Sequence, residues 1–323
     1  MMWGRRGSCL FCSGPLGEPL FTNVRDRLRI SSRQWTFRQC LVCKSAVLDP
    51  MPSSEELTAA YPEIYAFDQA PQTSWLSRLL YALEATLFYH PIYRHSARQT
   101  VRVTGLRDGW LLDIGGGTGH RTRFFQRLGF RCIVLDVDQR PLRIAQARFG
   151  LPAIQALSEE LPLAYGSLDL ITFFHVVEHL PDPSRALQAA YQRLRPGGWV
   201  AIAVPLISGG QARWLGPQWM GITEAPRHVS LPTPEGMRWL LERTGFRLQR
   251  WEAMHPLDEA GVLSLSLLPS ASSPIACAAP ERMLLRMLRL AGGLLTLALW
   301  PIALLLRVRF GPSMGIFFGR KAE

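Results

Sequence analysis

The stretch Gly109-Trp-Leu-Leu-Asp-Ile-Gly-Gly-Gly-Thr-Gly119 decides the fold of this chain. An apolar run ends in an acid and enters a turn rich in glycine, and the residues that follow, 120–128, predict a helix. Glycines at such a turn let the backbone approach a ligand closely and leave helix-start amide groups free to donate hydrogen bonds. The pattern is typical of the first strand and helix of a doubly wound α/β sheet.

A second predicted strand covers 131–135 and ends in Asp136. An acid about 20 residues beyond the glycines stands where it can accept hydrogen bonds from both ribose hydroxyls of a nucleoside. Asp113, at the end of the first strand, is the other acid of this predicted pocket. Taken singly, either acid can also be an ordinary strand-end cap, and the glycines can be a tight turn.

The glycine spacing separates two classes of enzyme. The string 113–119, DIGGGTG, resembles DxGxGxG, the first motif of class I S-adenosylmethionine-dependent methyltransferases, rather than the GxGxxG of dinucleotide enzymes. The resemblance continues through three more motifs, at 135–145, 158–171 and 175–205. It implies a Rossmann-like α/β core over 109–255, with a doubly wound, mostly parallel sheet of seven strands. A nicotinamide oxidoreductase is disfavoured, because no hydride-transfer constellation accompanies the glycines.

The same resemblance implies S-adenosyl-L-methionine as the cofactor. Family members often carry an acid at the position of Leu157 to meet the adenine amino group, so here stacking and Ser158 are expected to hold adenine instead. The residues that the resemblance assigns to the cofactor are Asp113, Gly115, Gly117, Gly119, Asp136, Val137, Leu157, Ser158 and His175.

Methyl transfer from a sulfonium is an in-line displacement, and an oxygen or nitrogen nucleophile also needs a base near the methyl group. The strand predicted at 168–173 delivers His175, Glu178 and His179 to the edge of the sheet where ligands bind. We therefore expect catalytic groups here, although His175 can instead contact the cofactor and His179 can cap the next helix. The segment resembles ubiquinone-pathway O-methyltransferases, whose Glu-x-x-Glu-His string can hold a divalent ion; His175 replaces the first glutamate.

The acceptor side is expected from residues 214–246, which resemble the substrate region of the same methyltransferase group. Arg227 is a candidate to pair with an anionic acceptor, and His228 is a candidate base. Trp214 and Trp219 are candidates for the pocket wall. For Arg227 and His228, packing of a surface loop is an equal alternative.

Two CxxC pairs near the N-terminus predict a structural zinc site with the ligands Cys9, Cys12, Cys40 and Cys43. A redox motif or a pair of disulfides are the alternatives, and a redox motif needs only one pair. The interval between the pairs is longer than the ~15–20 residues usual in a zinc ribbon. Residues 1–50 are thus expected to form a zinc-ribbon-like domain, and 51–108 a helical bridge that lids the core.

The C-terminal region predicts two more strands, at 245–251 and 313–321, separated by an apolar helical insert over 256–312. Its run 291–306 carries no charge, but it is shorter than the ~20 residues of a spanning helix. If both flanking strands belong to one sheet, the insert must return to the side it left, which favours a monotopic or re-entrant helical hairpin with peripheral membrane contact through 283–309. Arg282, Arg286, Arg289, Arg307 and Arg309 would then face anionic head groups. A lid or dimer interface is the alternative.

The net charge of +11 comes almost entirely from scattered arginines, with lysine only at Lys44 and Lys321. This distribution argues against a nucleic-acid partner. We expect a cytoplasmic protein, peripheral at the inner face of the membrane, that methylates a small or lipid-linked acceptor at oxygen or carbon. The competing hypothesis is a catalytically silent adaptor that uses its zinc ribbon and nucleotide fold to bind partners.

Overall fold

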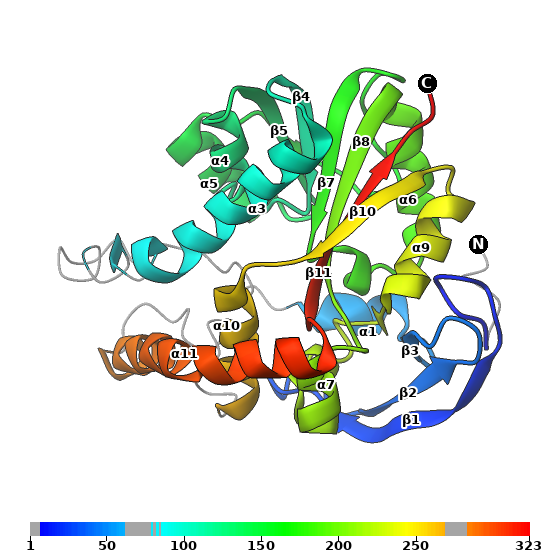
Figure 1. Cartoon of the computed structure of the whole chain (residues 1–323), viewed down its shortest axis with the longest axis vertical. Helices are drawn as coiled ribbons and strands as arrows, with labels where there is room; N and C mark the ends of the chain where they lie inside the picture. The colour runs from blue at the N-terminus through cyan, green and yellow to red at the C-terminus, as the bar shows by residue number, and fades with distance from the viewer. Residues whose placement is uncertain (1–6, 62–78, 80–81, 84, 269–282) are drawn as a thin grey trace.

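The structure is a computed structural model, and it describes residues 7–61, 79, 82–83, 85–268 and 283–323. The predicted helical residues 62–78, Cys277 and Arg282 lie outside the described residues. Figure 1 shows a central sheet flanked by helices on both faces, with a second, smaller sheet beside it.

The central sheet confirms the predicted seven-stranded α/β fold. Five neighbouring strands of the sheet run parallel to one another. The last strand in the sequence is antiparallel to both of its neighbours near one edge. The order across the sheet is β10 (Arg247–Ala253), β11 (Met314–Arg320), β8 (Leu194–Pro205), β7 (Leu168–Phe174), β4 (Gly109–Ile114), β5 (Phe130–Asp136) and β6 (Ala153–Gln155).

Helices cover both faces of this sheet, because its inner strands bury apolar side chains on two sides. Phe125 and Leu142 belong to the core on one face, whereas Leu187 and Leu240 belong to the core on the other. The helix predicted at 120–128 is shorter than expected, since it is regular only over α4 (Thr122–Gln126). The covering helices are α3 (His90–Thr104), α4 (Thr122–Gln126) and α5 (Gln139–Phe149) on the first face, and α6 (Pro183–Arg193) and α9 (Pro234–Arg243) on the second.

The N-terminal sheet is continuous with a segment of the core. Its strands β1 (Leu16–Arg25), β2 (Gln34–Cys40) and β3 (Ala46–Leu48) form an antiparallel meander, and β9 (Ser230–Leu231) pairs with β3. The N-terminal residues therefore brace the loop that precedes β9. The described residues also contain short helical elements: α1 (Ser54–Ala59), η2 (Ala85–Tyr89), η3 (Val177–His179), α7 (Gly210–Leu215), η4 (Gly216–Gln218) and α8 (Met220–Thr223).

The insert between β10 and β11 contributes two helices, α10 (Pro256–Leu267) and α11 (Met283–Phe310). Ala260 and Leu263 of α10 pack with Ala303 and Leu306 of α11. In the described ranges, the one helix long and apolar enough to cross a membrane is Ala291–Phe310, with mean hydropathy 1.8 and 17% of its most apolar window buried. Because β10 and β11 are neighbours in one sheet, the insert leaves and returns at the same edge, as predicted.

Candidate functional site

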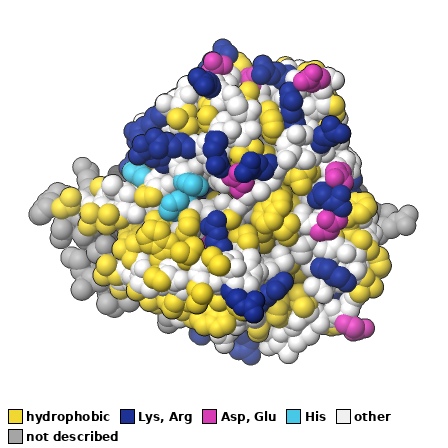
Figure 2. Space-filling view, viewed as in Figure 1, with side chains coloured by type: hydrophobic (Ala, Val, Ile, Leu, Met, Phe, Trp, Pro, Cys, Tyr) yellow, Lys and Arg dark blue, Asp and Glu magenta, His cyan; other side chains and the backbone are white. Residues whose placement is uncertain are grey.

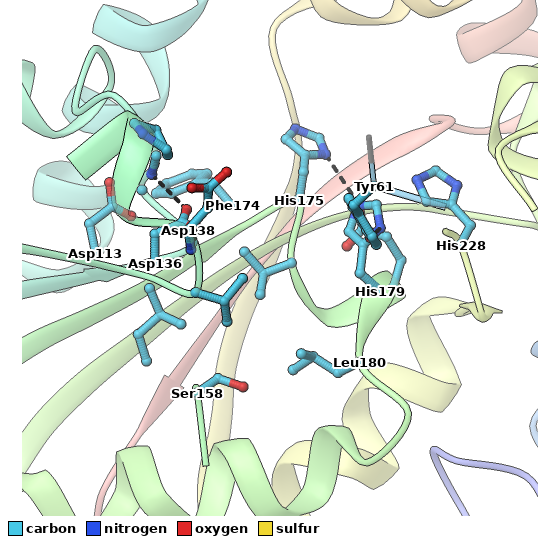
Figure 3. Close-up of a pocket in the computed structure, with 18 of the residues that line it drawn as sticks. Tyr61, Asp113, Asp136, Asp138, Ser158, Phe174, His175, His179, Leu180 and His228 are labelled. Carbon is cyan, nitrogen blue, oxygen red and sulfur yellow. Dashed lines mark hydrogen bonds and ion pairs between the residues drawn. The ribbon is translucent and has the colours of Figure 1, made fainter. Parts of the chain in front are cut away.

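The carboxyl ends of β4, β5 and β7 open onto one pocket with a volume of about 740 Å³. The glycine turn after β4, the loop after β5 and the segment after β7 line one part of it. The loop around His228 and residues Val262 and Leu265 of α10 line the rest. Figure 3 shows the two predicted acids on one side of this pocket and the histidines on the other.

Asp113 is the last residue but one of β4, beneath the glycine turn, and is 2% exposed. The hydroxyls of Thr122 and Thr172 each donate a hydrogen bond of 2.6 Å to its carboxylate, one to each oxygen. Burial raises the pKa of Asp113, and the two hydroxyls oppose that rise. Asp113 lines the pocket and also ties the start of α4 to β7.

Asp136 lies at the end of β5, on the strand beside Asp113. Its carboxylate accepts the backbone N–H of Gly117 at 3.1 Å and the N–H of Asp138 at 3.0 Å. Burial raises its pKa, although both N–H groups favour the ionised form. The two predicted acids therefore lie on adjacent parallel strands and line a common pocket, with the glycine turn between them.

The glycine turn needs the left-handed backbone that glycine adopts without strain. Gly115 has φ +66°, and a Cβ there would lie 2.5 Å from a methyl group of Val176. Gly119 differs from the other two predicted glycines, because a Cβ there would lie 2.6 Å from Leu151 and the residue is not among those lining the pocket. We therefore leave Gly119 out of the proposed cofactor site, since its role is packing against the end of α5.

The three residues predicted at the adenine end lie together. Val137 and Leu157 are 61% and 47% exposed, and both line the pocket beside the buried Ser158. The hydroxyl of Ser158 donates to the carboxylate of Glu159 at 3.0 Å. Two apolar side chains open to the cavity provide a surface on which adenine is expected to stack.

His175 follows β7 directly and adopts φ 59°, which is uncommon for a residue with a Cβ. Such a conformation is strained and is often found at functional sites. Its Nδ1 lies 3.5 Å from Oε1 of Glu178, which is 1% exposed on the side chain. Burial lowers the pKa of His175 to about 4 and raises the pKa of Glu178. The pair lines the pocket as predicted.

His179 and His228 meet at the far side of the pocket, with ring centroids 4.7 Å apart. Nδ1 of His228 lies 2.7 Å from the carbonyl oxygen of Gly221, so Nδ1 carries the proton and donates. Nδ1 of His179 lies 3.0 Å from the carbonyl oxygen of Arg227 and 2.9 Å from the hydroxyl of Tyr61. Burial lowers the pKa of both histidines, that of His179 to about 4.

Glu178, His179 and His228 each offer one ligand atom, and these atoms lie within 4.8 Å of one another. One oxygen of Glu178 is buried without a hydrogen-bond partner among the described residues. A carboxylate and two neutral imidazoles form a donor set that suits a divalent transition metal. The same three groups also suit general base chemistry without a metal.

The structure does not bring Arg227, Trp214 or Trp219 into the pocket lining. Arg227 is fully buried behind the wall, and its guanidinium pairs with Asp26 at 2.7 Å and with Glu224 at 2.8 Å. Trp219 is 0% exposed, and Trp214 is 54% exposed outside the pocket. We therefore leave these three residues out of the proposed acceptor site. Arg227 instead anchors the loop of His228 to the N-terminal sheet.

Sequence reasoning missed several lining residues. Tyr61 precedes a stretch outside the described residues and had no motif around it. Arg121 stands two residues after the glycine turn, a position that the motif leaves unspecified. Val262 and Leu265 belong to α10, which the sequence assigned to the insert rather than to the pocket. Because most of the residues around them in this helix are also apolar, their sequence gave no signal that one face reaches a cavity.

The four predicted zinc ligands converge. The Sγ atoms of Cys9 and Cys43 are 3.5 Å apart, those of Cys12 and Cys40 are 3.4 Å apart, and all four atoms lie within 4.8 Å of one another. All four are free thiols. Zinc bonds of about 2.3 Å in tetrahedral geometry require sulfur separations near 3.8 Å, which this cluster nearly matches. Backbone N–H groups of Phe11, Gly14 and Val42 point at three of the sulfurs.

Comparison with known protein families identifies the core. Residues 92–250 match the family described as "Methyltransferase domain". This chain carries a methyltransferase domain. The matched range contains the glycine turn, both acids and all four predicted catalytic residues.

Curated relatives of the methyltransferase domain include two enzymes named for quinone biosynthesis. The ubiquinone biosynthesis O-methyltransferase of Leptothrix cholodnii is 31% identical over 125 residues, which is 35% of this chain and 51% of that protein. The ubiquinone/menaquinone biosynthesis C-methyltransferase of Pseudoalteromonas translucida is 31% identical over 118 residues, which is 33% of this chain and 47% of that protein. The chain thus spans about half the length of these relatives.

Solved structures similar to this chain include a SAM dependent methyltransferase from Archaeoglobus fulgidus. It is 20% identical with a TM-score of 0.48, and the match covers 75% of this chain and 99% of that one.

Proposed function

We propose that this chain is an S-adenosylmethionine-dependent methyltransferase that methylates an oxygen or carbon atom of a small or lipid-linked acceptor. One observation carries the proposal. Asp113 and Asp136 end adjacent parallel strands, flank the glycine turn and line the same pocket as His175, Glu178, His179 and His228. A nucleoside held by the acids would thus direct its reactive end toward the histidines.

The nucleoside end of the pocket offers Asp136 for the ribose hydroxyls and Val137, Leu157 and Ser158 for adenine. S-adenosylmethionine supplies an electrophilic methyl group when it is bound. The chain aligns the acceptor atom with that methyl group and excludes water, which are the main contributions to an in-line displacement.

His228 is the proposed base. Its Nδ1 donates to the Gly221 carbonyl, so a neutral ring presents the lone pair of Nε2. Burial lowers the pKa of His228, which keeps the ring neutral near pH 7. Glu178 stabilises the imidazolium that forms when His228 takes a proton from an acceptor hydroxyl or activated carbon, because its charge raises the pKa of His228.

Titration calorimetry with S-adenosylmethionine tests this proposal. We expect one binding site per chain and, with extracts of quinones and lipids, transfer of labelled methyl to an acceptor. Failure of the wild-type protein to bind the nucleoside would favour the silent adaptor, in which the nucleotide fold serves only to recruit partners.

A lipid-linked acceptor is supported by the outer face of α11. Leu294, Leu305 and Val308 are 67%, 66% and 78% exposed, and Figure 2 shows hydrophobic side chains gathered over this part of the molecule. The η2 segment adds the exposed Leu87 beside it, because Phe88 lies against Gly293. We call this surface the α11 face.

The α11 face connects to the pocket through one helix. Leu263 of α10 packs on α11, whereas Val262 and Leu265 of the same helix line the pocket. We propose that the α11 face lies in the head-group layer of the inner membrane leaflet as a monotopic anchor. Arg309 follows the apolar run at the helix end, where it can meet anionic lipid. Arg307 does not face outward as expected, because its guanidinium donates to the carbonyl of Met254 at 2.9 Å and lies 3.9 Å from the carboxylate of Glu259. The side chains of Arg286 and Arg289 are not described.

Vesicle sedimentation tests the anchor. The variant Leu305→Glu with Val308→Glu should lose binding to vesicles of phosphatidylcholine and phosphatidylglycerol. Tyr165→Glu is the matched control, because Tyr165 is 72% exposed outside the α11 face. Equal sedimentation of the double variant and the wild type would contradict a membrane role.

The proposed second cofactor is structural Zn²⁺ held by Cys9, Cys12, Cys40 and Cys43. Four thiolates fill a tetrahedral shell and leave no position for substrate, so the ion supplies folding free energy rather than catalysis. Thr233 connects the site to the methyltransferase domain, since its hydroxyl donates to the Cys43 carbonyl at 2.6 Å.

A further inference from the structure

Arg121 is a pocket residue whose guanidinium is held by aromatic rings. It lines the pocket directly after the glycine turn. Its guanidinium carbon lies 4.4 Å from the ring centroid of Phe174 and 4.9 Å from that of Tyr93. Packing on the ring faces fixes the plane of the guanidinium. The N–H donors lie in that plane, so the rings do not block them. The orientation of the fork is thus set before any ligand binds.

The other arginines that line the pocket already have acceptors. Arg27 donates to the carbonyl of Leu265 at 2.8 Å, and Arg140 donates to the carboxylate of Asp138 at 2.6 Å. The guanidinium of Arg121 makes no hydrogen bond and no ion pair with any residue in the described ranges, and its Nη1 is buried without a partner. A buried N–H group of a guanidinium is costly without an acceptor, which indicates that a ligand completes the site.

The position of Arg121 indicates which end of the pocket the ligand group occupies. Its guanidinium lies over the ring of Phe174, which directly precedes His175, and the next residue in the chain, Thr122, donates to Asp113. Arg121 therefore lies near both the acid below the glycine turn and the proposed catalytic residue His175. This is the methyl-transfer end of the pocket, away from Leu157 and Ser158.

We propose that Arg121 is an oxyanion anchor, which binds a carboxylate or phosphate group of a ligand through two parallel N–H donors. A guanidinium fork matches either group, whereas a neutral acceptor would leave its charge unpaired. This proposal rests on the proposed function. The bound group can then come from either of two sources, which are the methionine carboxylate of the cofactor and a carboxylate or phosphate on the acceptor.

Two nucleosides distinguish these sources. S-adenosylhomocysteine carries the carboxylate, whereas 5′-methylthioadenosine lacks the amino-acid portion. If the anchor holds the methionine carboxylate, Arg121→Gln weakens S-adenosylhomocysteine about 10- to 100-fold and leaves 5′-methylthioadenosine unchanged. Arg121→Lys, which keeps the charge but not the fork, should give an intermediate loss. Arg140→Gln is the matched control and should change the ratio of the two affinities little.

If the anchor holds the acceptor instead, both nucleosides bind the variant as they bind the wild type. Inorganic phosphate, titrated with and without S-adenosylhomocysteine and followed by NMR, then binds the wild type and not Arg121→Gln. Unchanged binding of both nucleosides and of phosphate would overturn the anchor. Wild-type protein that binds neither nucleoside would refute the methyltransferase proposal, and the phosphate titration without nucleoside would still decide the role of Arg121. Thermal melting establishes that each variant is folded.

Discussion

Replacement of Asp136 by asparagine removes one charge from the pocket and keeps the shape of the side chain. In the structure, one carboxylate oxygen accepts the N–H of Gly117 and the other accepts the N–H of Asp138. Each oxygen has a second lone pair for a ribose hydroxyl. Asparagine keeps one acceptor oxygen, and its amide group cannot accept from a backbone N–H or a hydroxyl.

The expected loss follows from these contacts. A hydrogen bond to an ionised group contributes about 1.5–3 kcal/mol, and the variant loses one such bond and weakens the other. We expect a loss of about 2–3 kcal/mol, which corresponds to about 30- to 150-fold weaker binding of S-adenosylmethionine. Loss of one backbone acceptor should also lower the free energy of unfolding by about 1 kcal/mol.

Titration calorimetry on Asp136→Asn measures this change directly. Asp138→Asn is the matched control, since Asp138 also lines the pocket but caps α5 and pairs with Arg140. Asparagine is as good a cap as aspartate, so the control should bind the nucleoside within about threefold of the wild type. Equal affinity of Asp136→Asn and the wild type would refute the assignment of Asp136 to the ribose.

Three further perturbations follow from the same structure. His228→Gln should lower kcat about 100- to 10,000-fold and leave the nucleoside affinity unchanged. The activity of the wild-type enzyme should persist at pH 6.5, because burial lowers the pKa of His228. A pH profile in which kcat falls with a midpoint above pH 7 on the acid side would contradict this. Burial raises the pKa of Glu259 to about 7, so the folded state binds more protons than the unfolded state between pH 4.5 and 7, and stability falls as pH rises through that window. Glu259→Gln should remove this fall and gain about 2 kcal/mol at pH 8 in urea unfolding, whereas an unchanged pH dependence would refute the burial argument. Metal analysis should find one zinc per chain, and Cys40→Ser should lower both the zinc content and the melting temperature; full stability without zinc would contradict a structural ion.

The sheet and its cofactor edge could be predicted because each depends on local pattern. Buried strands produce continuous apolar runs, and Asp113 and Asp136 stand at the ends of two such runs. The glycines between them need positive φ, which few other residues tolerate. Each of these signals lies within a short stretch of chain, so tertiary contacts did not have to be known.

The acceptor side could not be predicted in the same way. Arg227 was expected to bind a ligand, but it forms an ion pair with Asp26, which lies far away in the sequence. Nothing in the sequence around Asp26 indicates that it pairs with Arg227. The pairing of Ser230 with Val47 could not be predicted either, since a strand of two residues shows no periodicity in the sequence. Arg121 was passed over because the motif specifies glycines and an acid, not the side chain that stacks beside them.

The central claim is that one pocket holds a nucleoside next to His175, His179 and His228. A crystal structure with S-adenosylhomocysteine tests this claim most directly. We expect the ribose hydroxyls within hydrogen-bond distance of Asp136, adenine between Val137 and Leu157, and the sulfur facing His175 and His228. A nucleoside bound elsewhere, or one whose sulfur points away from both histidines, would contradict the account.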